Sequence, residues 1–365
     1  MPVHFSAERW ERIKQNARLW WQGELGRPLI QLTDGNADPG RPEPPLPGLG
    51  FHSGYDLSVP AAEIVDRWDY DLGHVRHWGD SFPSVWPNFG PGVMAAFLGA
   101  VLHDARDTVW FHPETEVALS DVPMRFDPDN RWLRRVSDLT RTAVERWEGQ
   151  VQVGLTDLGG GLDVLASFRP SEALLYDLYD VPEVVKKRSW DVHTLWWQYF
   201  DHFARLMQPA NPGYTAWTPI FSESPYYMLQ CDFCYMISPE MFDEFVKPEL
   251  AASCRRLAHA FYHLDGPGQL PHLDSLLTIP ELKGVQWVPG DGQPDVSHWP
   301  QVYRKIRDAG KLIQVFTGQY EGGMTVIDVL AEQLGSAEGI VVIGDTGAYS
   351  DDEVRSLLAR HHASD

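Results

Sequence analysis

The sequence predicts an α/β protein built as a single (β/α)8 barrel of the TIM type, with an elaborated N-terminal region. From residue 151 onward, short apolar strand-like runs recur at intervals of roughly 24–30 residues, and helical patterns follow them. Several of these strands run into Gly-rich turns that carry ionisable side chains, as barrel strands do at their C-terminal rim. A length of 365 residues suits one such barrel with a large core.

The individual elements follow from hydrophobic periodicity and from turn residues. Helices are expected at 6–22, 61–68, 93–101, 130–148, 171–178, 182–206, 239–258, 269–277, 298–309, 326–334 and 351–361. Strands are expected at 27–33, 108–112, 151–157, 215–220, 227–231, 260–263, 284–288, 311–316 and 340–343. The last seven strands supply seven barrel units, and 29–33 or 75–80 supplies the eighth.

The chain is expected to form one structural domain. Residues 1–110 would contain the N-terminal extension and the first barrel elements, and 111–365 the remainder of the barrel. The segment 35–50 is rich in Gly and Pro and reads as a lid over the barrel mouth.

Charge and composition exclude several classes of partner. The net charge of −21 opposes binding to nucleic acid or to an anionic membrane. No apolar run approaches the length of a transmembrane helix, and the N-terminus lacks the apolar region of a signal peptide, so a cytoplasmic protein is expected. Cys231 and Cys234 have C-x-x-C spacing without a second pair to complete a zinc site, so free cysteines are expected.

The stretch 260–268, AFYHLDGPG, is the strongest candidate for a functional site. An apolar strand ends there in a Gly/Pro turn, and it carries His263 and Asp265 two residues apart. Residues i and i+2 of a strand point to the same side, so the imidazole and the carboxylate should face one pocket together. The alternative is a purely structural role, in which the histidine hydrogen-bonds to a turn carboxylate and takes part in no chemistry.

Other strand ends should contribute side chains to the same pocket, because the strand ends of a barrel converge at one face. The opposing catalytic carboxylate is expected to be Glu321 or Glu223. The expected substrate-binding residues are carboxylates and aromatic side chains near strand ends, namely Asp80, Asp157, Asp232, Asp291, Asp345, Trp78, Trp86, Trp217, Trp287, Tyr262 and Tyr320. Crowded carboxylates separate one another's pKa values and can supply an acid and a base at neutral pH.

One segment resembles a known family. The run 238–249, SPEMFDEFVKPE, is similar to a helix opening of the uroporphyrinogen decarboxylase superfamily, which also contains corrinoid-linked methyltransferases. His263-Leu264-Asp265-Gly266 stands where those proteins carry an H-x-C-G turn, and 285–288 and 344–347 resemble their later strand and Gly-rich turn. Trp78-Gly79-Asp80 resembles the decarboxylase's F-S-D turn, whose Asp holds pyrrole nitrogens. The resemblance covers roughly 150–360 and, more faintly, the N-terminal third, and it implies a barrel enzyme acting on a small molecule.

The departures from this family matter for function. The methyltransferases have a zinc site of H-x-C and a distant Cys, but here Asp265 replaces the first thiol and the turn at 346–348 has none. A harder divalent metal on His263 and Asp265, with Glu321 as a third ligand, is the corresponding expectation. The arginine-rich N-terminal segment that would bind a substrate with eight carboxylates is missing from 1–50, which argues against porphyrinogen decarboxylation.

The leading hypothesis is carboxylate/His acid–base chemistry of the glycosidase type on a polar, carbohydrate-like substrate, with indole faces over a carboxylate-lined cleft. The first alternative is a corrinoid- or folate-linked methyltransferase with an altered metal site, which would need a corrinoid protein as partner. The second alternative is a non-catalytic ligand-binding barrel. No cofactor is specified by the sequence, beyond the divalent metal that His263 and Asp265 could hold.

Overall fold

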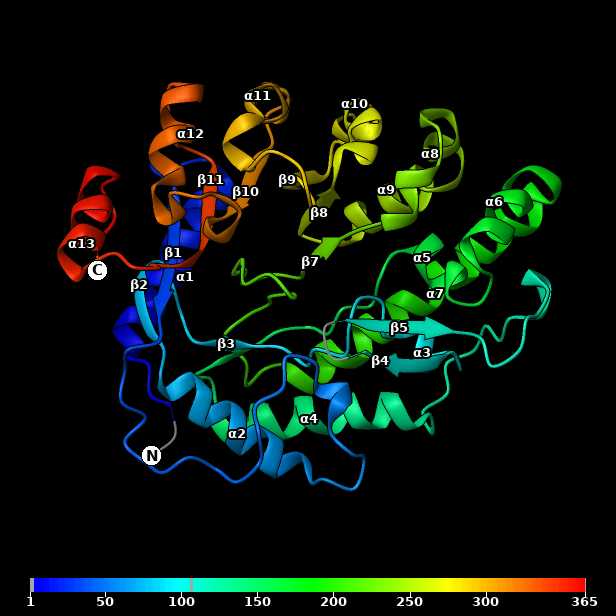
Figure 1. Ribbon diagram of the computed structural model, residues 1–365, viewed down its shortest axis with the longest axis horizontal. Helices are drawn as coiled ribbons and strands as arrows, with labels where there is room; N and C mark the ends of the chain where they lie inside the picture. The colour runs from blue at the N-terminus through cyan, green and yellow to red at the C-terminus, as the bar shows by residue number, and fades with distance from the viewer. Residues whose placement is uncertain (1–2, 106–107, 365) are drawn as a thin grey trace.

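The computed structural model describes residues 3–105 and 108–364 and shows an α/β protein whose main sheet has seven strands (Figure 1). The strand order is β2-β1-β11-β10-β9-β8-β7, and every neighbouring pair is parallel except β1 with β2. These strands are β1 (Leu29–Asp34), β2 (Arg76–Gly79), β7 (Tyr226–Leu229), β8 (His259–Asp265), β9 (Leu282–Val288), β10 (Leu312–Phe316) and β11 (Ile340–Asp345). The predicted alternation of strands and helices in a mainly parallel sheet is confirmed.

The helices alternate with the strands along the C-terminal half and form a separate group in the N-terminal half. They are α1 (Ala7–Gln22), α2 (Ala61–Gly73), α3 (Met94–Phe97), α4 (Arg131–Trp147), α5 (Gly161–Ala166), α6 (Ser171–Asp180), α7 (Pro182–Met207), α8 (Pro239–Phe245), α9 (Lys247–Arg256), α10 (Leu273–Leu277), α11 (Pro300–Asp308), α12 (Val326–Leu334) and α13 (Asp351–Arg360). In Figure 1, α10, α11 and α12 lie along one side of the sheet, whereas α2, α4 and α7 pack together across the molecule.

Local sequence sets the helix boundaries. At the start of α1, the Ser6 hydroxyl accepts a hydrogen bond from the backbone N–H of Arg9 at 3.2 Å, and Gly23 ends the helix in the left-handed region with φ 74°. The predicted helix 239–258 is two helices, because Pro248 lies in the first turn of α9 and cannot donate a backbone hydrogen bond to the preceding turn.

Four short strands lie outside the main sheet. The antiparallel hairpin β4 (Val101–Asp104) and β5 (Val109–His112) contains the predicted strand 108–112, and β4 begins where the predicted helix 93–101 was expected to end. The parallel pair β3 (Ser84–Val85) and β6 (Gln152–Val153) contains only part of the predicted strand 151–157.

The predicted strand 215–220 is wrong. The segment forms one isolated antiparallel bridge, Tyr214 with Ser222, and a tight turn in which the Ile220 N–H donates to the Thr218 carbonyl at 2.9 Å. Pro219 cannot donate a ladder hydrogen bond, which explains why the chain turns here. Among the described residues no strand pairing joins β7 to β2, so the closed eight-stranded barrel stays a prediction.

Besides a smaller cluster that includes Trp10 and Phe221, one large apolar cluster holds the elements together. It contains Trp20 from α1, Phe97 from α3 and Val342 from β11, so residues on both sides of the predicted boundary at 110 share it. That boundary falls inside β5. No helix within the described ranges is long and apolar enough to cross a membrane.

Candidate functional site

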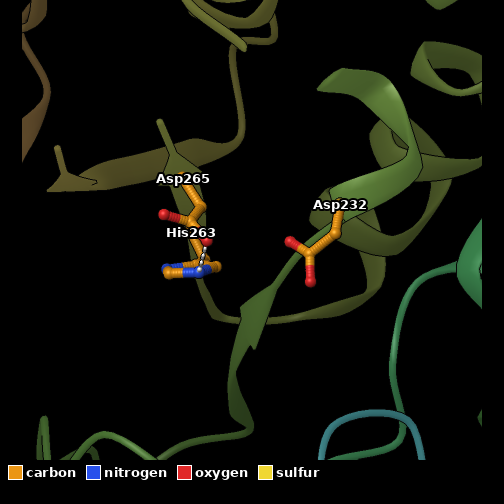
Figure 2. Close-up of side chains that lie close together, drawn as sticks. All are labelled: Asp232, His263 and Asp265. Carbon is orange, nitrogen blue, oxygen red and sulfur yellow. Dashed lines mark ion pairs between the residues drawn. The ribbon is translucent and has the colours of Figure 1, made fainter. Parts of the chain in front are cut away.

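Three ionisable side chains meet at the carboxyl ends of β7 and β8. These strands are parallel neighbours, with Leu229 opposite Tyr262, so the segments that follow them leave the sheet at the same edge. Asp232 begins the short 3-10 helix η3 (Asp232–Met236) after β7, and His263 and Asp265 lie in the last three residues of β8. One ligand atom from each of the three lies within 4.8 Å of the others, and Figure 2 shows the Asp232 carboxyl directed toward the pair on β8.

His263 and Asp265 do share one side, as the alternation of strand side chains predicts. The Nε2 atom of His263 is 3.9 Å from a carboxylate oxygen of Asp265. The ring edge of His263 also meets Trp217, with ring centroids 5.1 Å apart and planes at 90°. Burial lowers the pKa of His263, although the nearby Asp265 charge acts in the opposite direction, so the imidazole is neutral at neutral pH.

A line of buried amides orients the His263 ring. The Oε1 atom of Gln286 on β9 contacts Nδ1 of His263, and the Gln286 side-chain N–H donates to Gln314 on β10 at 2.5 Å. His263, Gln286 and Gln314 are directly opposite one another across the three strands, and both glutamines are fully buried. With Gln286 as acceptor, Nδ1 carries the proton and the Nε2 lone pair faces the carboxylates.

Two further carboxylates support the site, Asp157 from the segment before α5 and Asp163 from the first turn of α5. Asp163 accepts hydrogen bonds from the backbone N–H groups of Asp232 (3.1 Å) and Phe233 (2.8 Å), which fixes the start of η3. Asp157 is buried and accepts from the backbone N–H of Gly159 at 2.8 Å. Burial raises the pKa of each of these two carboxyl groups to about 7. The charge of Asp163 adds to the effect at Asp157, and the charge of Asp232 adds to it at Asp163.

Asp232 also borders a pocket of about 390 Å³. The residue as a whole is exposed, but its carboxyl group faces this concave surface, where loss of solvation, followed by the charge of Asp265, raises its pKa to about 7. Gln230 and Asp163 line the pocket with it, and Trp110 and Met236 form part of its apolar rim. Among the described residues the lining contains no lysine or arginine, and His112 is its one basic side chain.

Asp80 and Trp78 are not at this site, contrary to the prediction. Because β2 runs antiparallel to β1, its carboxyl end lies beside the start of β1, at the opposite edge of the sheet. Asp80 there forms a buried ion pair with Arg27 at 2.7 Å and accepts the Ile30 N–H. Trp78 is buried and donates its indole N–H to Asp34 at 2.7 Å.

Glu223, expected as a carboxylate opposing His263, also lies away from this site. It precedes β7, and therefore lies at the amino end of that strand, where it forms an exposed ion pair with Arg18 at 2.8 Å. Glu321 follows β10 at the predicted edge, but it is exposed and does not belong to the group formed by Asp232, His263 and Asp265.

Two of the predicted aromatic residues face the other side of the sheet. Tyr262 and Trp287 alternate with His263 and Gln286, so they point toward the outer layer. The Tyr262 hydroxyl donates to Gln269 at 3.2 Å, and Trp287 packs edge-on against Trp299 with centroids 5.1 Å apart. The remaining predicted residues, Trp86, Asp291, Tyr320 and Asp345, lie outside the three-residue group and keep their status as predictions.

Sequence reasoning overlooked Gln286 and Gln314 because amides carry no charge. Strand alternation could have revealed them, since both lie in predicted strands and each is flanked by two apolar residues.

No known protein-family model matches this chain, and no curated protein has a matching sequence.

Proposed function

We propose that the protein is a small-molecule enzyme whose centre is Asp232, His263 and Asp265, and that these three residues hold a divalent cation. The observation that carries this proposal is the convergence of three acceptor atoms within 4.8 Å, one of them the unprotonated Nε2 of a neutral imidazole. Acceptors that face one another repel unless a proton or a cation lies between them, and a divalent cation satisfies all three at once.

The chemistry of the three ligands fits such an ion. One imidazole and two carboxylates suit Mn²⁺, Zn²⁺ and similar ions, and three protein ligands leave positions open for water and substrate. The two carboxylates also balance the charge of the ion. When bound, a divalent cation polarises a substrate oxygen or lowers the pKa of a bound water. Asp163 holds the backbone of Asp232 in place, and Gln286 holds the His263 ring.

The substrate class follows from the surroundings. Since the described residues that line the pocket beside Asp232 include no lysine or arginine, only His112 could pair with an anionic substrate, and a phosphorylated or polycarboxylate substrate is disfavoured. A polar, uncharged and carbohydrate-like molecule agrees with this pocket and with the indole of Trp217 at His263.

The (β/α)8 architecture is also part of the proposal. Two hydrogen bonds support it. The Gly154 N–H donates to the Val85 carbonyl (2.7 Å), which extends the β3–β6 pair, and the Leu155 N–H donates to the Thr215 carbonyl (2.9 Å), which links the end of β6 to the segment at 215.

A second candidate is cation-free acid–base chemistry of the glycosidase type. The observation that favours it is the position of Asp232, which replaces Glu223 and Glu321 as the carboxylate beside Asp265. The ligand oxygens of these two residues lie within 4.8 Å, close to the carboxyl separation of about 5–5.5 Å in retaining glycosidases. Methyl transfer with a corrinoid partner is supported by the sequence resemblance alone, and Cys231, Cys234 and Cys254 are all buried.

Cation titration of the purified protein tests the proposal. After dialysis against a chelator, calorimetry with Mn²⁺ and Zn²⁺ should show one ion per chain. Asp232→Asn and Asp265→Asn should each weaken that binding at least tenfold, whereas Glu223→Gln should bind as the parent does. An equal affinity in all four proteins would refute the cation centre. Release of reducing sugar from glycosides by the chelator-treated protein would instead support the second candidate.

A further inference from the structure

A second pocket, of about 260 Å³, lies against β1 and β11, away from the carboxylates described above. Gln31 and Thr33 of β1 line it, together with Ile343 and Gly344 at the end of β11. His77, Ser81 and Ser84 complete its polar surface. The volume is several times the roughly 30 Å³ that one water occupies in the liquid, so the pocket has room for a small molecule.

Gln31 points to a ligand in this pocket. Its side chain is 4 % exposed, and its Oε1 atom has no hydrogen-bond partner. An unsatisfied buried amide oxygen costs roughly 1–3 kcal/mol, so such a group persists only where something compensates for it. A hydroxyl or N–H donor on a bound molecule would satisfy Oε1.

The polar lining is uncharged, which defines the class of ligand. Among the described residues that line it, the polar side chains are one amide, three hydroxyls and the imidazole of His77, with no acidic and no other basic residue. The His77 Nδ1 atom lies 3.0 Å from the Ser81 hydroxyl. Burial, followed by the charge of Arg9, lowers the pKa of His77 to about 4, so the ring is neutral near pH 7. Alternating hydroxyl, amide and imidazole groups suit a ligand with several hydroxyls and no net charge.

The pocket lies on the same face of the sheet as His263. Paired residues on neighbouring strands point to one face, and the pairs His263–Gln286, Gln286–Gln314, Gln314–Val341 and Val341–Leu29 connect β8 to β1. Gln31 follows Leu29 by two positions and therefore shares that face. The loop 217–219 touches both places, because Trp217 meets His263 and Pro219 lines the pocket.

We infer that this pocket binds a small uncharged molecule of the sugar or polyol type, through Gln31 and the hydroxyls around it. Calling that molecule the substrate rests on the proposed function, but its binding does not require the cation. The two ideas therefore fail separately.

Calorimetry on chelator-treated protein, which carries no added cation, provides the test. D-glucose and myo-inositol serve as uncharged probes, and D-glucose 6-phosphate and D-glucosamine as charged ones. At least one uncharged probe should bind saturably and more tightly than either charged probe. Gln31→Leu should weaken that binding about tenfold, which corresponds to the loss of one hydrogen bond of about 1.4 kcal/mol.

Two further variants keep the test decisive. Ser84→Ala removes a lining hydroxyl with little change in volume and should also weaken binding of the uncharged probe. It provides the test if Gln31→Leu fails to fold. Glu223→Gln, at an exposed ion pair outside both places, should leave binding of the uncharged probe intact. Absence of saturable binding by both uncharged probes, unchanged affinity in the folded pocket variants, or tighter binding of the sugar phosphate would each overturn the inference.

Discussion

Gln286 accepts a hydrogen bond from Nδ1 of His263, from a position directly opposite it on the neighbouring strand. The same glutamine donates to Gln314 on the next strand, so its amide cannot rotate without breaking a second buried hydrogen bond. The imidazole is therefore held with Nε2 toward Asp232 and Asp265. The arrangement makes a neutral, fully buried amide part of the candidate centre.

We expect Gln286→Leu to weaken cation binding by about 10–100-fold, the usual effect of removing the partner that orients a metal-binding histidine. Gln286→Glu is the matched variant, because it keeps an acceptor opposite Nδ1 and should retain most of the affinity. Nitrogen NMR shifts of His263 should show the Nδ1–H tautomer in the parent and a mixture of tautomers in the leucine variant. Equal affinity and an unchanged tautomer in both variants would rule out this role.

Asp157 should make the folded protein less stable as pH rises. Its pKa is raised by burial to about 7 from an ordinary 3.8, so the folded state holds a proton that the unfolded state releases. The stabilisation is complete below about pH 3.8 and is lost progressively as pH rises to about 7. One proton corresponds to a slope of up to about 1.4 kcal/mol per pH unit.

Asp157→Asn should remove that contribution, because an amide stays neutral and its oxygen can still accept from the Gly159 N–H. Urea unfolding at pH 5 and pH 7 measures it. The asparagine variant should gain stability relative to the parent on going from pH 5 to pH 7. If the two proteins show the same pH dependence, the Asp157 carboxyl does not titrate in this way.

The sequence was sufficient to predict the C-terminal strands and the shared orientation of His263 and Asp265 on β8, because strand alternation depends only on neighbouring residues. It failed where a long-range choice decides direction. Nothing in Arg76–Gly79 distinguishes a parallel from an antiparallel strand, and that choice moves Asp80 to the far edge of the sheet. Asp232 was recognised only as a strand-end residue, since its distance from His263 depends on the register between β7 and β8.

The two acidic residues at the opposite edge should affect stability differently. Asp80→Ala leaves the Arg27 guanidinium buried without its partner and should destabilise the fold by about 3–5 kcal/mol. Glu223→Ala removes an exposed ion pair with Arg18 and should change stability by no more than about 1 kcal/mol. Chemical denaturation measures both, and cation affinity should be unchanged in the folded fraction of each. A loss of cation binding in the well-folded Glu223→Ala protein would return Glu223 to the centre.

Gly160 lies so close to Asp163, a residue that supports the candidate centre, that there is no room for a side chain at position 160. Its backbone, with φ −89° and ψ 164°, suits any residue, so only space requires glycine here. A Cβ atom at this position would lie 2.6 Å from a carboxylate oxygen of Asp163 and would also meet the backbone carbonyl of Gln230.

Gly160→Ala should therefore cost about 1–3 kcal/mol, as overpacking of a filled interior does. Because Asp163 holds the backbone of Asp232 and Phe233, the displaced carboxylate should also move Asp232 and weaken cation binding. Gly50→Ala is the control, since a Cβ there has no atom within 4 Å. Thermal unfolding and cation titration of the two variants measure both effects. Normal cation affinity in a destabilised Gly160→Ala protein would show that Asp163 does not position Asp232.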